Sequence, residues 1–117
     1  MEFIEYSKCS TCKKAKKYLD DKNIKYTDRE IKEKCPTIKE ITNWINSYNI
    51  DINKLFNTSG LVYRSMNLKD KLKEMKVEEK IKLLSENPML IKRPILVTNS
   101  KILVGFKEAD WNESINN

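Results

Sequence analysis

Histidine is absent from this chain of 117 residues. Its absence excludes the Cys/His and Ser/His pairs of nucleophilic enzymes and removes the commonest metal ligand. Cysteine occurs only three times, and an odd number argues against the disulfide framework of a secreted protein. No apolar run is long enough for a signal peptide or a membrane span, so a cytoplasmic location is the default expectation. The length predicts a single domain over residues 1–117 with one core.

Arginine is also scarce, because three arginines stand beside twenty lysines. The formal net charge is +6, from 23 basic and 17 acidic residues. Such a surplus attracts anions, and nucleic acid is the first partner to consider. The lysines are, however, spread along the chain and mixed with glutamates, as on a solvated surface. We therefore expect neither direct nucleic-acid binding nor a membrane partner.

The first thirty residues have the pattern of a strand, a helix and a second strand. "FIEY" (3–6) predicts a short strand, and a helix is expected to run to about residue 21, with Ser10 or Thr11 as its capping residue. Three small or apolar residues fall on one face of this helix: Cys12, Ala15 and Leu19. "IKYTDREI" (24–31) predicts the second strand, and a strand–helix–strand unit normally builds a parallel pair.

Helices are predicted for the middle of the chain. Thr37 and Glu40 form a capping box, and apolar residues at helical spacing extend the helix to residue 48: Ile41, Trp44, Ile45 and Tyr48. Shorter helices are expected around 51–56, 67–74 and 77–86. "RPILVT" and "KILVGF" then predict two strands joined at Asn99-Ser100, before a last helix at about 107–115. This order predicts an α/β, thioredoxin-like β-α-β…β-β-α fold with a helical insertion at about 37–90.

"SKCSTCKK" places two cysteines three residues apart where the first strand becomes the first helix. At a helix N-terminus, backbone N–H groups and the helix dipole favour a thiolate, so Cys9 is the expected nucleophile. Lys8 and the lysines of the helix add positive potential. Cys12 lies one turn later and can resolve a mixed disulfide formed at Cys9.

Two other interpretations of the cysteine pair remain. A structural zinc site needs four ligands, and Cys35 is the only further sulfur, so no metal is expected. The pair could also be inert buried thiols, since small cysteines are common in cores. Cys35 precedes a proline in a charged loop and is interpreted as an incidental thiol.

Four segments together resemble the arsenate reductase-like family, which also contains the Spx-type transcriptional regulators: "YSKCSTCKKAKKYL", "LFNTSGLVYRSMNLKDKL", "MLIKRPILV" and "ILVGFKE". The similarity runs in the same order over about residues 3 to 113. It is closest to the small reductase-like branch of Gram-positive bacteria. The segment beginning "FNTSG" is the most distinctive, whereas Cys-x-x-Cys alone would be a weak signal.

The resemblance implies roles for individual residues. The catalytic cysteine of the glutaredoxin-linked arsenate reductases falls on Cys9; that class has a serine at the position of Cys12 and completes its cycle with glutathione. Two oxyanion-binding arginines fall on Arg64 and Arg93, and a third would fall at Gly105, where it is missing. Pro94, next to Arg93, matches the proline that is cis in thioredoxin-like folds. The resemblance thus implies thiol chemistry with weak or no arsenate reduction.

Two classes of function follow from the resemblance. The first is a thiol oxidoreductase acting on a small thiol or oxyanion, with glutathione, thioredoxin or glutaredoxin as reductant and no bound cofactor. The second is an Spx-type regulator that binds RNA polymerase and uses the two cysteines as a redox switch. The segment "NTSGLVYRSMNLKDKL" resembles the reductase-like branch, and the chain ends in "WNESINN" without the regulators' basic tail. The enzyme is therefore the preferred interpretation.

Overall fold

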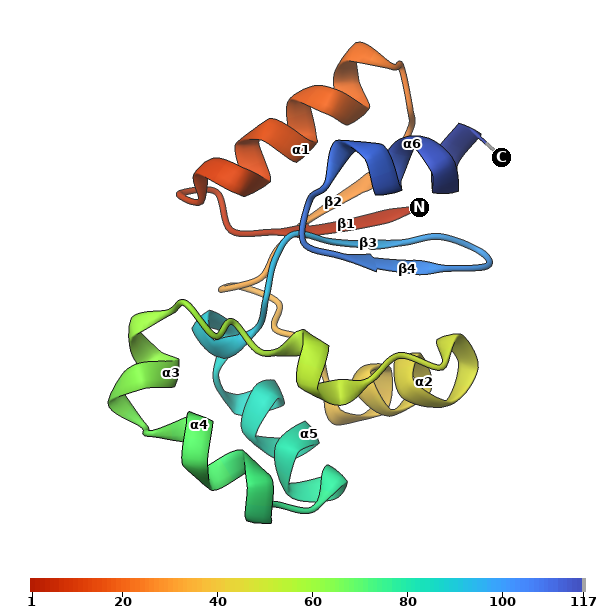
Figure 1. Ribbon diagram of the computed structural model, residues 1–117. Helices are drawn as coiled ribbons and strands as arrows, with labels where there is room; N and C mark the ends of the chain where they lie inside the picture. Colours follow the sequence, from red (N-terminus) through yellow and green to blue (C-terminus); the bar gives the residue numbers. More distant parts are fainter. Residues whose placement is uncertain (117) are drawn as a thin grey trace. The chain divides into compact units, whose positions relative to one another are not determined.

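Strand β1 (Glu2–Glu5) organises the sheet because both of its edges are paired. In this computed structural model, which describes residues 1–116, β1 pairs in parallel with β2 (Thr27–Glu30). Its other edge pairs antiparallel with β3 (Ile95–Val97), which in turn pairs with β4 (Ile102–Val104). The strand order is β2-β1-β3-β4, with β1 and β3 at the centre (Figure 1).

Helices α1 (Ser10–Asp21) and α6 (Glu108–Asn116) lie on the same side of this sheet (Figure 1). They bury an aromatic-rich core that consists of Phe3, Ala15, Tyr18, Leu19, Leu96 and Trp111. Its rings meet edge to face, and the centroids of Phe106 and Trp111 lie 4.9 Å apart. Such pairs add to the stabilisation by burial and hold the helices at a defined distance from the sheet.

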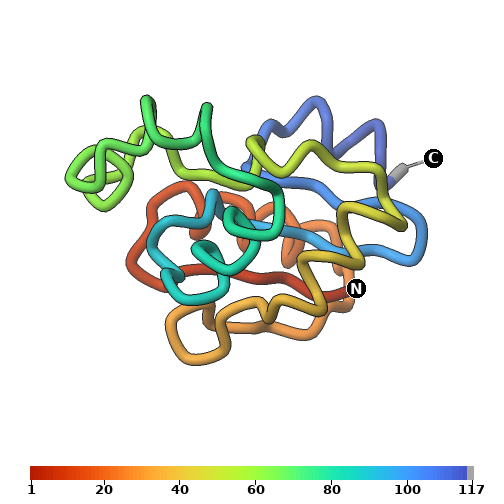
Figure 2. The backbone as a smooth tube through the Cα atoms, turned by 90° about the horizontal axis from the view of Figure 1, so that it is seen from below, coloured from red at the N-terminus to blue at the C-terminus, as the bar shows by residue number. Residues whose placement is uncertain are grey.

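The chain divides into two compact units, Met1–Ile31 with Arg93–Asn117, and Lys32–Lys92. Figure 2 shows the second unit as one continuous stretch of the chain, which follows β2 and precedes β3. Apart from an isolated bridge between Phe56 and Ile91, the regular elements of the second unit are helical. Its elements are α2 (Ile38–Tyr48), 3₁₀ helix η1 (Ile52–Leu55), α3 (Leu61–Ser65), α4 (Leu68–Lys71), η2 (Leu72–Glu74), α5 (Val77–Glu86) and η3 (Pro88–Leu90).

The predicted α/β, thioredoxin-like order is confirmed, and so are several of its local details. The Thr37–Glu40 capping box starts α2, with Glu40 N–H to Thr37 Oγ1 at 3.1 Å. The predicted apolar face of α1 is buried. Within residues 1–116, no helix is both long and apolar enough to cross a membrane.

Two predictions about local structure were wrong, and one helix was missed. The predicted strand 24–31 is limited to Thr27–Glu30, because Asn23 takes a left-handed conformation (φ 57°) and Ile24 N–H still bonds to Leu19 O. Neither Ser10 nor Thr11 caps α1, since Ser10 is already helical and Cys9 is the capping residue. The five-residue helix α3 was not predicted.

Candidate functional site

The turn from β1 to α1 places Cys9 at the N-terminus of the helix. Cys9 N–H donates to Tyr6 O at 2.9 Å, and Cys9 O accepts the N–H of Lys13 at 3.1 Å. The Cys9 backbone is extended (φ −88°, ψ 124°), and no side chain caps the helix. The first N–H groups of α1 therefore have no side-chain oxygen in front of them, and the Cys9 sulfur lies at the positive end of the helix.

The electrostatic surroundings of Cys9 favour its thiolate. Burial alone would raise the pKa of the half-buried Cys9 thiol. Hydrogen bonds from the backbone N–H and the thiol of Cys12, the N–H of Thr11 and the positive charge of Arg93 outweigh it. The pKa of Cys9 is consequently below its ordinary value, as expected for a thiol at a helix N-terminus in a positive setting.

Cys12 has the opposite character. Its side chain is fully buried, and burial is the largest cause that raises its pKa to about 12. The Tyr6 backbone N–H lowers this pKa, whereas the hydrogen bond and the charge of Cys9 raise it. Cys9 and Cys12 are free thiols in this structure. The pair therefore combines an accessible thiol that ionises readily with a buried thiol that stays protonated.

The segment before β3 adds a cation to the site. Arg93 lies half-buried with its guanidinium carbon 5.2 Å from the centroid of the Tyr6 ring, which belongs to the turn that precedes Cys9. Its Nε atom is buried and has no hydrogen bond within residues 1–116, although the side chain has other interactions. The Arg93–Pro94 peptide bond is cis. Cys9, Cys12, Arg93 and Pro94 all belong to the first unit.

Gly105 is tied to the same segment through its backbone. Its N–H donates to Pro94 O at 2.8 Å, and its carbonyl accepts the indole N–H of Trp111 at 3.1 Å. Gly105 has a φ of 76°, in the left-handed region that favours glycine. The local backbone therefore accounts for glycine at the position where the resemblance would place a third arginine.

Two further predicted site residues are Arg64 and Lys8. Arg64 belongs to the second unit, where its exposed guanidinium donates to Ser59 O at 2.8 Å. Its part in an oxyanion site stays a prediction. Lys8 is exposed and makes no ion pair within residues 1–116.

Cys35 belongs to the second unit and donates its thiol to Leu84 O at 3.6 Å. The described residues include no group of three ligands that could hold a metal ion.

A carboxylate that the sequence analysis missed holds the turn in front of Cys9. The Glu30 carboxylate accepts the Ser7 hydroxyl at 2.8 Å and the Ser7 N–H at 3.2 Å to each oxygen. Glu30 reaches this turn because it pairs with Glu5 in the parallel register of β1 and β2. An acidic residue at the end of the second strand was the only signal in the sequence.

A second feature that was not predicted is a cluster of three charged side chains, Lys16 of α1, Glu5 of β1 and Asp28 of β2. Lys16 Nζ lies 3.3 Å from the carboxylate of Glu5 and 2.8 Å from that of Asp28. Glu5 is only 5% exposed. Burial and, after it, the neighbouring Asp28 raise the pKa of Glu5 to about 7, although Lys16 acts against this shift.

The sheet order, the two helices on one face and the cysteine pair after β1 define a thioredoxin-like fold. Residues 4–114 match the model of the ArsC family. The chain belongs to this family.

Relatives of the chain include proteins with different descriptions. The uncharacterized protein YusI of Bacillus subtilis (strain 168) is 40% identical over 114 residues, which are 97% of each chain. The regulatory protein MgsR of the same organism is 30% identical over 110 residues, 94% of this chain and 86% of its own. The crystal structure of a possible arsenate reductase from Streptococcus mutans UA159 is 42% identical, with a TM-score of 0.88 over 99% of this chain and 97% of its own.

Proposed function

We propose that the protein is a thiol-dependent oxidoreductase in which Cys9 is the nucleophile and Cys12 the resolving thiol. The contrast between the two thiols carries this proposal. Cys9 is half-buried with a lowered pKa, whereas Cys12 is fully buried with a raised one. An accessible thiolate attacks first, and a protected thiol in the next turn of the helix is the natural second nucleophile.

The reaction with a disulfide substrate takes two steps. The Cys9 thiolate attacks one sulfur of the substrate, and the other sulfur leaves as a thiolate that takes up a proton. Cys12 then loses its proton and attacks the Cys9 sulfur, which releases the second substrate thiol and forms the Cys9–Cys12 disulfide. The substrate has gained two electrons. Glutathione, thioredoxin or glutaredoxin would supply two electrons to reduce the Cys9–Cys12 disulfide and restore both thiols. A reducing compartment such as the cytoplasm suits this cycle.

An oxyanion such as arsenate is the weaker candidate substrate. Arg93, and Arg64 by resemblance, would supply guanidinium donors that suit a tetrahedral oxyanion. A charge-assisted hydrogen bond contributes roughly 1.5–3 kcal/mol, so a missing third arginine lowers the rate roughly ten- to a hundredfold. The positive φ of Gly105 supports this proposal, because the backbone there disfavours a side chain. Cys12 would also capture a Cys9 adduct before glutathione does.

A redox-sensing regulator is the second candidate, and the similarity to MgsR favours it. In this case the Cys9–Cys12 disulfide would be the signal, and RNA polymerase the partner. Purification of the tagged protein from a cell lysate, with reduced and oxidised samples in parallel, separates the two functions. Recovery of RNA polymerase subunits with one redox state only would favour the regulator.

Intact-mass measurement tests the proposed chemistry. The reduced protein is treated with glutathione disulfide, hydrogen peroxide or arsenate and compared with Cys9→Ser, Cys12→Ser and the control Cys35→Ser. We expect glutathione disulfide to oxidise both the unaltered protein and Cys35→Ser. The product should have two hydrogens fewer, because it contains the Cys9–Cys12 disulfide. Cys12→Ser should retain a glutathione adduct, and Cys9→Ser should stay unmodified at neutral pH. Oxidation of Cys9→Ser at the rate of the unaltered protein would contradict the proposal.

A further inference from the structure

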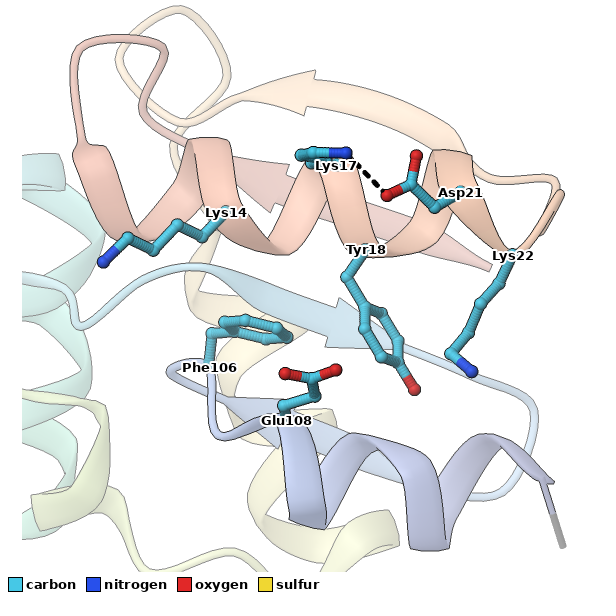
Figure 3. A pocket seen from close by; sticks show the side chains of 7 residues that line it. All are labelled: Lys14, Lys17, Tyr18, Asp21, Lys22, Phe106 and Glu108. Carbon is cyan, nitrogen blue, oxygen red and sulfur yellow. Dashed lines mark hydrogen bonds and ion pairs between the residues drawn. The ribbon is translucent and has the colours of Figure 1, made fainter.

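A groove of about 460 Å³ runs between α1 and α6 in the first unit (Figure 3). Five of its lining residues come from α1 and its C-cap, one from the turn before α6 and one from the start of α6: Lys14, Lys17, Tyr18, Asp21 and Lys22, then Phe106, then Glu108. Its volume is within the range of sites that hold a small molecule or a few side chains of a partner. None of these residues takes part in the thiol chemistry proposed above.

The floor of the groove is aromatic and rigid. The rings of Tyr18 and Phe106 meet edge to face with centroids 5.5 Å apart, and Phe106 packs on the buried Trp111. The Tyr18 hydroxyl donates to the side-chain oxygen of Asn112 in α6. The floor is thus fixed from both helices, and the half-buried Phe106 ring leaves apolar surface for one side chain of a partner.

The rim of the groove is mainly cationic. Lys17 is paired with Asp21 at 2.7 Å, so these two charges largely compensate each other. Lys22 Nζ lies 5.1 Å from the centroid of the Tyr18 ring, at one end of the groove in Figure 3. Lys14 lies toward the other end and makes no ion pair within residues 1–116. Besides the Lys17–Asp21 pair, the charges of the lining are therefore the two ammonium groups of Lys14 and Lys22 and the carboxylate of Glu108.

Helix stability does not explain the lysines at the start of α1. The first two turns of this helix contain four lysines, of which Lys14 and Lys17 line the groove, and no acidic residue lies in the first turn. Cations near a helix N-terminus are unfavourable because the helix dipole is positive there. Lys16 is held by Glu5 and Asp28, and Lys17 by Asp21. Lys14 makes no such ion pair within residues 1–116, so its charge is available to an external anion.

We propose that this groove binds an acidic segment of a partner protein, with one apolar side chain on Phe106 and flanking carboxylates at Lys14 and Lys22. A nucleic acid fits less well. Tyr18 is only 8% exposed, so it offers no ring face for a base, and the groove contains no arginine. The carboxylate of Glu108 would also repel a dense row of phosphates. The lysine–carboxylate contacts steer the partner, and the aromatic floor adds affinity.

The test is a titration of the isotope-labelled protein with a synthetic peptide, followed by NMR. The peptide carries one phenylalanine with two glutamates on either side. We expect amide shifts at α1 and α6 around the groove. Lys14→Gln and Lys22→Gln should each weaken binding about two- to fivefold, the range of exposed ion pairs. Glu108→Gln should strengthen binding by a similar factor, because it removes the opposing charge.

Matched controls distinguish a specific groove from general attraction to a basic protein. Lys39→Gln removes an exposed lysine of α2 and should leave the affinity unchanged. A peptide with serine in place of phenylalanine should bind several-fold more weakly. The proposal would be overturned if that peptide or a single-stranded DNA oligonucleotide bound equally well. It would also be overturned by an unchanged affinity for Glu108→Gln or by the absence of amide shifts at the groove. Cys9→Ser should bind like the unaltered protein, so failure of the thiol mechanism and failure of the groove are separate results.

Discussion

The buried carboxyl group of Glu5 should make the first unit less stable as the pH rises toward 8. Its pKa in the folded protein is about 7, compared with an ordinary value of 4.5, mainly because of burial and the neighbouring Asp28. The folded state therefore holds a proton between these two pH values that the unfolded chain has released. A raised folded pKa contributes stability below pH 4.5, and this stability is lost as the pH rises through 7.

The size of the effect follows from the displacement of the pKa. A change from 4.5 to about 7 corresponds to roughly 3 kcal/mol of unfolding free energy. Lys16 and Asp28 have side chains that are 41% and 45% exposed, and solvent weakens their interaction with Glu5. We therefore expect a loss of about 2 kcal/mol between pH 5 and pH 8. The pKa of Asp28 is lowered from its ordinary value of 3.8, so the titration of Asp28 changes the unfolding free energy only below pH 5.

Urea unfolding under reducing conditions at several pH values measures this loss, with Glu5→Gln as the test variant. The two tryptophans report separately, because Trp111 lies in the first unit and Trp44 in the second. Glu5→Gln should remove most of the decline between pH 5 and 8, while the exposed control Glu33→Gln should retain it. The same decline in Glu5→Gln and the unaltered protein would refute the assignment, because then the proton is lost elsewhere.

Three further predictions concern the site itself. Iodoacetamide should label Cys9 faster than either other thiol at neutral pH, with an apparent pKa below that of a free cysteine; faster labelling of Cys12 would contradict the choice of nucleophile. Glu30→Ala should lower the stability in thermal unfolding by about 1 kcal/mol because the Ser7 turn in front of Cys9 loses its acceptor, and Glu30→Gln should partly restore it. Gly105→Arg should cost about 1–2 kcal/mol in thermal unfolding because of its positive φ, and Gly105→Asn less; equal stability would show that the backbone adapts.

The parts of the fold that the sequence predicted well are governed by neighbouring residues. Helix α1 follows from the spacing of Cys12, Ala15 and Leu19 on one face, and its bounds were close to the prediction. The start of α2 follows from a capping box four residues long. Helix α3 was missed for the opposite reason. Its five residues include none that is buried, so no periodic apolar signal marks it.

The site was predictable only where a residue lies next to its partner in the chain. Cys9 and Cys12 are recognisable because a helix brings residues three apart onto one face. Glu30 is 23 residues from Ser7, and only the parallel register of β1 and β2 brings the two together. Arg93 was identified by family resemblance alone. The structure places it on Tyr6 because β3 pairs with the other edge of β1.

The difference between the two thiols is a tertiary property that the Cys-x-x-Cys spacing cannot encode. Burial dominates the raised pKa of Cys12, and that burial requires the packed first unit. A reductase and a redox switch both need an accessible first thiol and a protected second one, so this site alone does not distinguish them. They differ in what they bind, and for that reason the decisive residues should lie on surfaces. Lys14 and Glu108 line the α1–α6 groove with opposite charges, so exchanging them tests the acidic partner proposed for that surface.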